Sequence, residues 1–213
     1  MKSDKKIDLI GSGLKPSFVF SLNENQIKYM TDYLSRTTYS VRNLTVFLLS
    51  IKGGLRSKEI ANLKWNMVLN SDGEIGDTIN LTNDSSKGKN GGRIIPLNKQ
   101  LKEQLKTWYY LRRTDGWLKD ITDSYVINSQ RSNNVKPQTI VNDFQKWYKN
   151  CGFIGCSSHS GRRTFITNLS KKISLVGGSL KDVMELAGHK HLQTTQLYIQ
   201  GDEDCKKKVV NLV

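Results

Sequence analysis

Histidine is rare in this chain, and its three copies lie in two dense polar clusters. His159 and Arg162 are three residues apart, so on a helix they occupy neighbouring positions and can face one phosphate. His189 opens the second cluster, which ends nine residues later at Tyr198. Imidazoles transfer protons and guanidinium groups bind phosphate oxygens, so both clusters contain groups suited to chemistry at a phosphate.

Each of these features also has an ordinary explanation. A His-x-x-Arg pair is often a hydrogen-bonding pair on a surface, and Tyr198 between two apolar neighbours could be a packed aromatic residue. Arg56 could simply begin a helix. Lys87 and Lys89 could be solvated charges in a loop. The joint occurrence and order of the features must therefore carry the argument.

Helical spacing of apolar residues defines the first elements that would position these groups. Ser21 with Glu24 forms a capping-box signature, which predicts that the first helix begins there. A second helix should end at Gly53 and Gly54, just ahead of Arg56. Ser57 is the expected cap of a short third helix.

A small antiparallel sheet should follow these helices. Ile79 and Leu81 alternate with polar residues, and Arg93–Leu97 forms a second extended run. Between the two runs, Ser85–Gly92 has the glycines and polar residues of a hairpin tip, and it carries positive charge.

Helical periodicity returns after the hairpin and continues to the end of the second cluster. The expected helices around the two histidine clusters are Ser160–Ile173, Ser179–Ala187 and Gln193–Gln200, after two earlier ones around Leu101–Trp108 and Pro137–Trp147. The predicted class is α+β, mostly helical with a small antiparallel sheet. We expect a flexible arm at 1–17, one domain at 18–200 and a tail at 201–213.

Composition favours a nucleic-acid partner inside the cell. Lys and Arg number 33 against 19 Asp and Glu, which gives a formal charge of +14 and makes phosphate backbones the obvious partner. Three cysteines without a secretory signal indicate a reducing compartment, and no apolar run is long enough to span a membrane. The expected location is the cytoplasm or nucleoid of the host cell.

Two further motifs precede the histidine clusters. Gly54–Ile60 has the form Gly-Leu-Arg-x-x-Glu-Ile, with Arg56 at its centre, and Lys87-Gly88 stands ahead of Ile95–Leu97, an Ile-Pro-Leu strand. Together with the His-x-x-Arg box and the Gly-His and Thr-Thr-x-x-Tyr boxes, they resemble the tyrosine recombinases of the phage-integrase family. The resemblance runs from about Ser21 to Gln200. The chain departs from the pattern at Gly161, where leucine is common, and at Arg163, where a second histidine is common.

The resemblance implies a function and a set of catalytic residues. The chain would be a site-specific recombinase that cleaves and rejoins DNA through a 3′-phosphotyrosyl link to Tyr198. Arg56 and Arg162 would hold the phosphate, His189 would add a hydrogen bond, and His159 would assist proton transfer. Lys87 would protonate the leaving oxygen, with Lys89 as a rival for that role. The expected DNA contacts are Lys89, Arg93, Arg163 and Lys190.

The same resemblance implies the partners. We expect double-stranded DNA with a specific site, a homotetramer on that DNA, and accessory DNA-bending or directionality proteins. The tail would either be exchanged between protomers of the tetramer or dock on its own domain. Only some 20 residues precede the first predicted helix, so no room is expected for the preceding DNA-clamping domain of most integrases. No cofactor is expected. Zinc ligation by Cys151, Cys156 and His159 is disfavoured because their spacing matches no common zinc pattern.

Two alternatives stay open at this point. One is a DNA-binding protein with the same fold and no catalysis, although no catalytic position is replaced. The other is a type IB topoisomerase, which uses similar chemistry without choosing a site.

Overall fold

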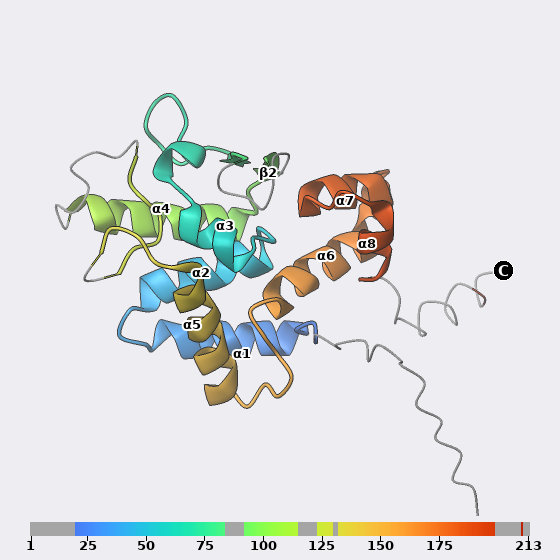
Figure 1. The fold of residues 1–213 in the computed structure, drawn as a ribbon, viewed down its shortest axis with the longest axis horizontal. Coiled ribbons are helices and arrows are strands. Elements are labelled where there is room, and N and C mark those ends of the chain that lie inside the picture. Colours follow the sequence, from blue (N-terminus) through green and yellow to red (C-terminus); the bar gives the residue numbers. More distant parts are fainter. Residues whose placement is uncertain (1–19, 84–91, 115–122, 130–131, 199–209, 211–213) are drawn as a thin grey trace, which may run out of the picture.

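The computed structural model describes residues 20–83, 92–114, 123–129, 132–198 and 210 of the chain. The predicted arm, most of the predicted tail and nearly all of the predicted hairpin tip lie outside these residues. No described helix combines the length and the hydrophobicity that a bilayer span requires. The elements, in chain order, are α1 (Glu24–Ser35), α2 (Ser40–Ile51), α3 (Ser57–Asn62), η1 (Trp65–Met67, a 3-10 helix), β1 (Thr78–Leu81), β2 (Arg93–Pro96), α4 (Lys99–Thr114), α5 (Pro137–Asn150), α6 (Ser160–Lys172), η2 (Ile173–Val176, also 3-10), α7 (Leu180–Ala187) and α8 (Leu192–Gln196) (Figure 1).

The two strands form the predicted antiparallel sheet. β1 pairs with β2 so that Ile79 lies opposite Ile95. Ile79, Leu81 and Ile95 are buried, whereas Ile94 is 65% exposed, as the period of two in a strand requires. The predicted α+β class, with a mostly helical body, is confirmed.

Two predicted helix starts were wrong. The first helix is capped by Asn23 rather than Ser21. The Asn23 side chain accepts from the backbone N–H of Gln26 at 2.9 Å, and the Gln26 side chain accepts from the backbone N–H of Asn23 at 3.0 Å. The third helix is capped by Arg56, and Ser57 is its first helical residue. The other predicted elements differ from the observed ones mainly at their ends.

The main hydrophobic core surrounds α2, whose residues 46–49 are buried and which packs against α1, α4 and α6. Gly54 follows α2 with a φ of +66°, in the left-handed region that glycine adopts readily. A Cβ at Gly54 would lie 2.3 Å from the ring of Phe165 on α6. Gly54 therefore turns the chain toward Arg56 and also allows α6 to approach.

Gly161 explains a second close approach between α2 and α6. A Cβ on Gly161 would lie 2.4 Å from Oγ of Ser50 on α2, which is closer than real side chains come. Gly161 therefore lets the start of α6 lie directly on α2.

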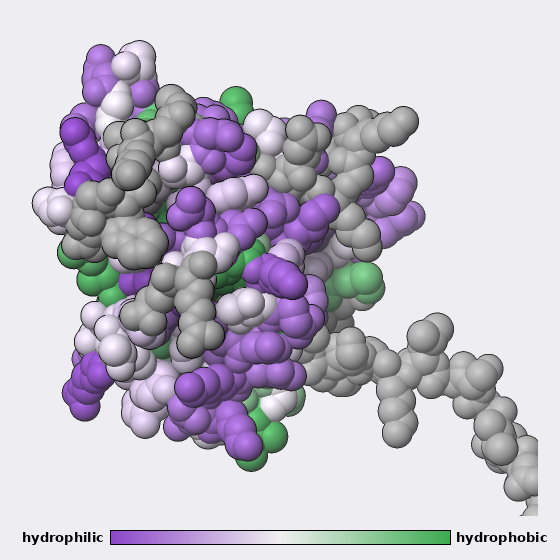
Figure 2. All heavy atoms as spheres, turned by 60° about the vertical axis from the view of Figure 1, so that its left-hand side comes forward, coloured by the Kyte–Doolittle hydropathy of each residue, from purple (hydrophilic) through white to green (hydrophobic). Residues whose placement is uncertain are grey.

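A second, smaller core joins α6 and α7. It consists of the buried residues Ile166, Val183 and Ala187, with Tyr198 among the partly buried residues packed on it. Figure 1 shows α7 and α8 gathered beside α6, on the far side from α1 and α5. Figure 2 shows one face of the molecule, where hydrophilic side chains predominate and apolar ones form small separate patches.

Candidate active site

Arg56 stands at the turn between α2 and α3, where it is the extended N-cap residue of α3. Its Nη1 donates to Oε1 of Glu59 at 2.7 Å, and its Nη2 reaches the carbonyl oxygen of Gly188 at 3.4 Å. The Arg56 side chain remains 31% exposed. Arg56 is therefore anchored from inside the protein and still open to a ligand.

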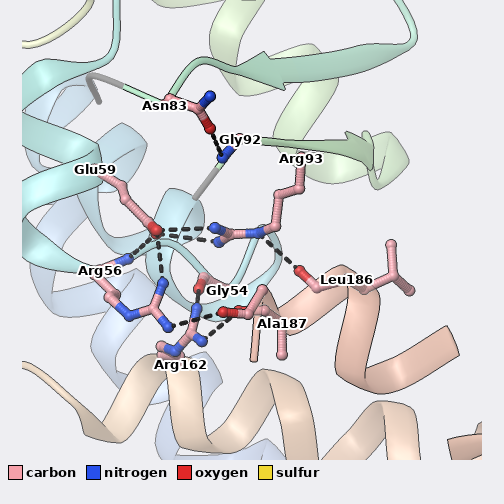
Figure 3. Close-up of polar contacts among 10 residues, drawn as sticks. Gly54, Arg56, Glu59, Asn83, Gly92, Arg93, Arg162, Leu186 and Ala187 are labelled. Carbon is pink, nitrogen blue, oxygen red and sulfur yellow. Dashed lines mark hydrogen bonds and ion pairs between the residues drawn. The ribbon is translucent and has the colours of Figure 1, made fainter. Parts of the chain in front are cut away.

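Glu59 is the buried carboxylate that joins two of the site's arginines (Figure 3). Its side chain is 1% exposed and accepts from the backbone N–H of Arg56 at 2.8 Å and from two guanidinium nitrogens of Arg93 at 2.8 and 3.1 Å. Burial alone would raise the pKa of Glu59, but the hydrogen bonds and charges of Arg93 and Arg56 lower it to about 2. Glu59 is therefore ionised at neutral pH.

Arg93 connects β2 to two other elements. Its Nε donates to the Leu186 carbonyl of α7 at 3.0 Å, while its other nitrogens bond Glu59 on α3 (Figure 3). Its side chain is 7% exposed. The guanidinium faces the interior, so a structural role fits this geometry better than the DNA contact predicted from the sequence.

Arg162 lies in the first turn of α6 and is 3% exposed. Its Nη1 donates to the Gly54 carbonyl at 2.6 Å, and its Nη2 donates to the Ala187 carbonyl (Figure 3). Burial lowers the pKa of Arg162, and the charges of Arg56 and Arg93 lower it further.

We call Arg56, Glu59, Arg93 and Arg162 the arginine cluster. Its three guanidinium groups are balanced by one carboxylate: Glu59 bonds Arg56 and Arg93, whereas the partners of Arg162 are neutral carbonyls. Positive charge is therefore in excess within the cluster, which favours binding of an anion there.

His189 follows Gly188, which ends α7 in the left-handed conformation. Its Nδ1 lies 2.9 Å from Oγ1 of the buried Thr195. Burial lowers the pKa of His189 to about 4, and the charges of the three arginines act in the same direction. The ring is therefore neutral at pH 7. When the Thr195 hydroxyl donates to Nδ1, Nε2 carries the ring proton and can donate it to a ligand.

Tyr198 lies beside His189, with ring centroids 5.4 Å apart and planes inclined by 27°. Its half-buried ring packs on the smaller core. Cζ of Arg163 lies 5.4 Å from the centroid of the Tyr198 ring, and Oγ1 of Thr167 donates to the Tyr198 carbonyl at 3.3 Å. Arg56, Arg162, His189 and Tyr198, all predicted from the sequence, are therefore brought together within one chain.

The remaining predicted residues are less closely tied to this group. His159 is the exposed residue before the first turn of α6, and Lys190 is exposed next to His189. Lys87 and Lys89 lie outside the described residues. The described ends of their hairpin, Asn83 and Gly92, are joined by a hydrogen bond of 2.8 Å beside Arg93 (Figure 3).

Sequence reasoning missed the pairing of Glu59 with Arg93. Glu59 was noted only as part of the Gly-Leu-Arg-x-x-Glu-Ile motif. An acidic residue three positions after an arginine can accept a hydrogen bond from the arginine's backbone N–H. Nothing in the sequence points to its second partner, which is 34 residues away.

Comparison with known proteins places this site in a family. Residues 21–204 match the family model described as the phage integrase family. The tyrosine recombinase XerA of Pyrococcus furiosus is 28% identical over 194 residues, which cover 89% of this chain and 60% of that relative. The chain therefore spans less than two thirds of this relative's length.

Solved structures share the fold. The crystal structure of XerA recombinase aligns with a TM-score of 0.71 at 20% identity, covering 90% of this chain and 64% of that one. The XerH site-specific recombinase bound to a palindromic difH substrate aligns with a TM-score of 0.69 at 20% identity, covering 89% and 51%.

Proposed function

The chain belongs to the phage integrase family, and from that premise we propose that it is a site-specific DNA recombinase with Tyr198 as its nucleophile. The observation that carries the proposal is the convergence of Arg56, Arg162 and His189 on a positively charged site beside the half-buried Tyr198. These groups supply charge stabilisation for a phosphate and an adjacent hydroxyl that can attack it.

The two arginines would bind the non-bridging oxygens of the scissile phosphate. Arg56 is partly exposed and Arg162 is held by two backbone carbonyls, so their guanidinium groups are oriented before DNA arrives. Preorganised donors of this kind stabilise charge that develops in the transition state. Neutral His189 would add a hydrogen bond from Nε2, since Nδ1 is engaged with Thr195.

Cleavage would form a bond from Oη of Tyr198 to phosphorus and break the bond from phosphorus to the 5′ oxygen. The 5′ oxygen leaves with the bonding electrons and takes a proton from Lys87, while the phenol proton passes to His159. Attack by a 5′ hydroxyl of a partner strand reverses these steps and restores Tyr198. The energy of the phosphodiester is kept in the covalent link, so the proposed steps call on no nucleotide or metal cofactor.

Lys87 remains the proposed acid and Lys89 its rival, since both belong to the hairpin whose described ends lie beside Arg93. Lys89 and the exposed Lys190 are proposed DNA contacts. Arg93 and Arg163 were expected to contact DNA too, but their guanidinium groups are engaged within the protein.

The partners also remain part of the proposal. XerH is described as bound to a palindromic DNA substrate, and the excess of 33 basic over 19 acidic residues suits double-stranded DNA here as well. We also propose that the protein assembles into a tetramer on DNA through residues 201–213. Accessory DNA-bending or directionality proteins would assist it, and it would act in the host cytoplasm or nucleoid.

The proposal is tested by incubating the protein with nicked duplexes taken from the DNA flanking its own gene. We expect an adduct that survives denaturing detergent with the wild type and none with Tyr198→Phe, which lacks the attacking oxygen. A lysate of the host can be added to supply helper proteins. If the protein then binds the duplexes without forming an adduct on any of them, the result would support a DNA-binding protein without catalysis. Relaxation of supercoiled plasmids that lack the site would indicate a topoisomerase instead.

A further inference from the structure

The ring of Tyr198 is contacted by α6 as well as by its own segment. Cζ of Arg163 lies 5.4 Å from the ring centroid, and Thr167, one turn later on the same face of α6, donates its hydroxyl to the Tyr198 carbonyl at 3.3 Å. His189 stacks on the same ring. Arg163 and Thr167 thus hold the ring and the backbone of one residue.

Two consecutive arginines of α6 therefore point to different parts of the site. Arg162 bonds the carbonyls of Gly54 and Ala187, on the side where the phosphate is expected. Arg163 is rotated from it by about 100° around the helix axis and lies over Tyr198. The position commonly filled by histidine in the family thus carries a cation that contacts the nucleophile.

Within the described part of the chain, Arg163 forms no ion pair with a carboxylate, and its guanidinium group contacts the Tyr198 ring. A guanidinium over an aromatic face is attracted by the negative potential of the ring, and this attraction strengthens where water is partly excluded. The Tyr198 ring is half-buried on the smaller core, so these conditions are met.

We propose that Arg163 is a positioning residue that holds the ring of Tyr198 beside His189 and Arg162 before DNA binds. The proposal rests on the proposed function in treating Tyr198 as the nucleophile. Arg163 acts through Tyr198, so its loss lowers the fraction of molecules with the hydroxyl in place. An arginine that only contacted DNA would instead set the affinity for DNA.

The contact itself can be measured without DNA. The eight tyrosines are replaced by 3-fluorotyrosine, and the fluorine resonance of Tyr198 is assigned by its loss in Tyr198→Phe. In Arg163→Met we expect that resonance to move toward its position in the unfolded protein, and in Arg163→Lys to move less. Lys172→Met, which removes a charge from an exposed position near the end of the same helix, is the matched control and should leave it unmoved. An unmoved resonance in Arg163→Met would overturn the proposal.

The consequence for cleavage is measured on the nicked duplex with protein in saturating excess. Loss of the cation–π contact should slow adduct formation about fivefold in Arg163→Met, with a smaller loss in Arg163→Lys. The affinity for DNA should match that of Lys172→Met. A wild-type rate at saturation, with the defect confined to affinity or salt dependence, would show that Arg163 is a DNA contact. If the wild type forms no adduct, the proposed function fails, whereas the fluorine measurement still decides whether Arg163 positions the ring.

Discussion

The arginine cluster and the nucleophile segment, residues 188–198 with the proposed nucleophile Tyr198, meet at the candidate site but rest on different parts of the fold. The cluster joins α3, β2, α6 and α7 through Glu59 and four backbone carbonyls, and Arg56 and Glu59 lie between buried residues of the main core. The nucleophile segment packs on a core with three buried residues, Ile166, Val183 and Ala187.

The kinds of contact differ as well. Charged hydrogen bonds in a buried site, such as those of Glu59 with Arg56 and Arg93, are strong and directional, so these two guanidinium groups are held in one geometry. Tyr198 is held by ring contacts and two hydrogen bonds, from its own N–H to the Thr195 carbonyl at 3.0 Å and from the Thr167 hydroxyl at 3.3 Å, each of modest strength. The comparison indicates that the arginine cluster is rigid and that the proposed nucleophile can be shifted at low energetic cost.

The largest effect should come from the carboxylate of the arginine cluster. Glu59→Gln leaves buried Arg93 without its counter-charge, so the free energy of unfolding should fall by about 3–5 kcal/mol. Urea unfolding measures this, with Glu103→Gln as a control because Glu103 is exposed and pairs with Lys106 at the surface. Adding Arg93→Met to Glu59→Gln should recover part of the loss. If the free energy of unfolding fell by under about 1 kcal/mol, which is the range of surface ion pairs, the contrast between the two regions would be contradicted.

A smaller effect is expected from the nucleophile segment. Thr195→Val keeps the shape of the buried side chain and removes the hydroxyl that bonds His189, so stability should fall by only about 1 kcal/mol. The rate of adduct formation should fall about tenfold, because His189 loses the partner that sets its tautomer. Thr194→Val changes the exposed neighbour and serves as the control. Equal rates for the two variants would remove the role given to Thr195.

The smallest effect should appear on mild acidification, and it should come from the nucleophile segment alone. The pKa of His189 is lowered from 6.5 to about 4, so the unfolded chain binds a proton more readily and stability falls as pH drops below 6.5. Glu59 has a pKa of about 2 in place of 4.5, so the stability that its ionised form contributes is lost only below about pH 4.5. Between pH 7 and 5.5 the His189 contribution should be on the order of 0.5 kcal/mol, reduced by its partial exposure.

Urea unfolding across that pH range checks the difference. His189→Gln should remove the fall in stability between pH 7 and 5.5 and leave the fall in stability below pH 4.5 in place. A slope that is unchanged in His189→Gln would show that another group titrates between pH 7 and 5.5, and that the nucleophile segment does not respond first.

Local sequence signals determined the elements and most of the site's members. Apolar periodicity predicted the helices and the hairpin because 3.6-residue and 2-residue repeats are local properties, whereas the exact helix starts were missed where Asn23 and Arg56 took the capping positions. The order of the motifs and their resemblance to the tyrosine recombinases predicted Arg56, Arg162, His189 and Tyr198 as site residues.

Only the tertiary structure decided how these residues are held. From the sequence, Arg93 and Arg163 were predicted to contact DNA, but β2 brings Arg93 to buried Glu59 and α6 points Arg163 at Tyr198. Such pairings join residues 34 and 35 positions apart. They depend on how helices pack, and helix packing depends on the volumes of many side chains together, such as the contact of Gly161 with Ser50, rather than on any local pattern.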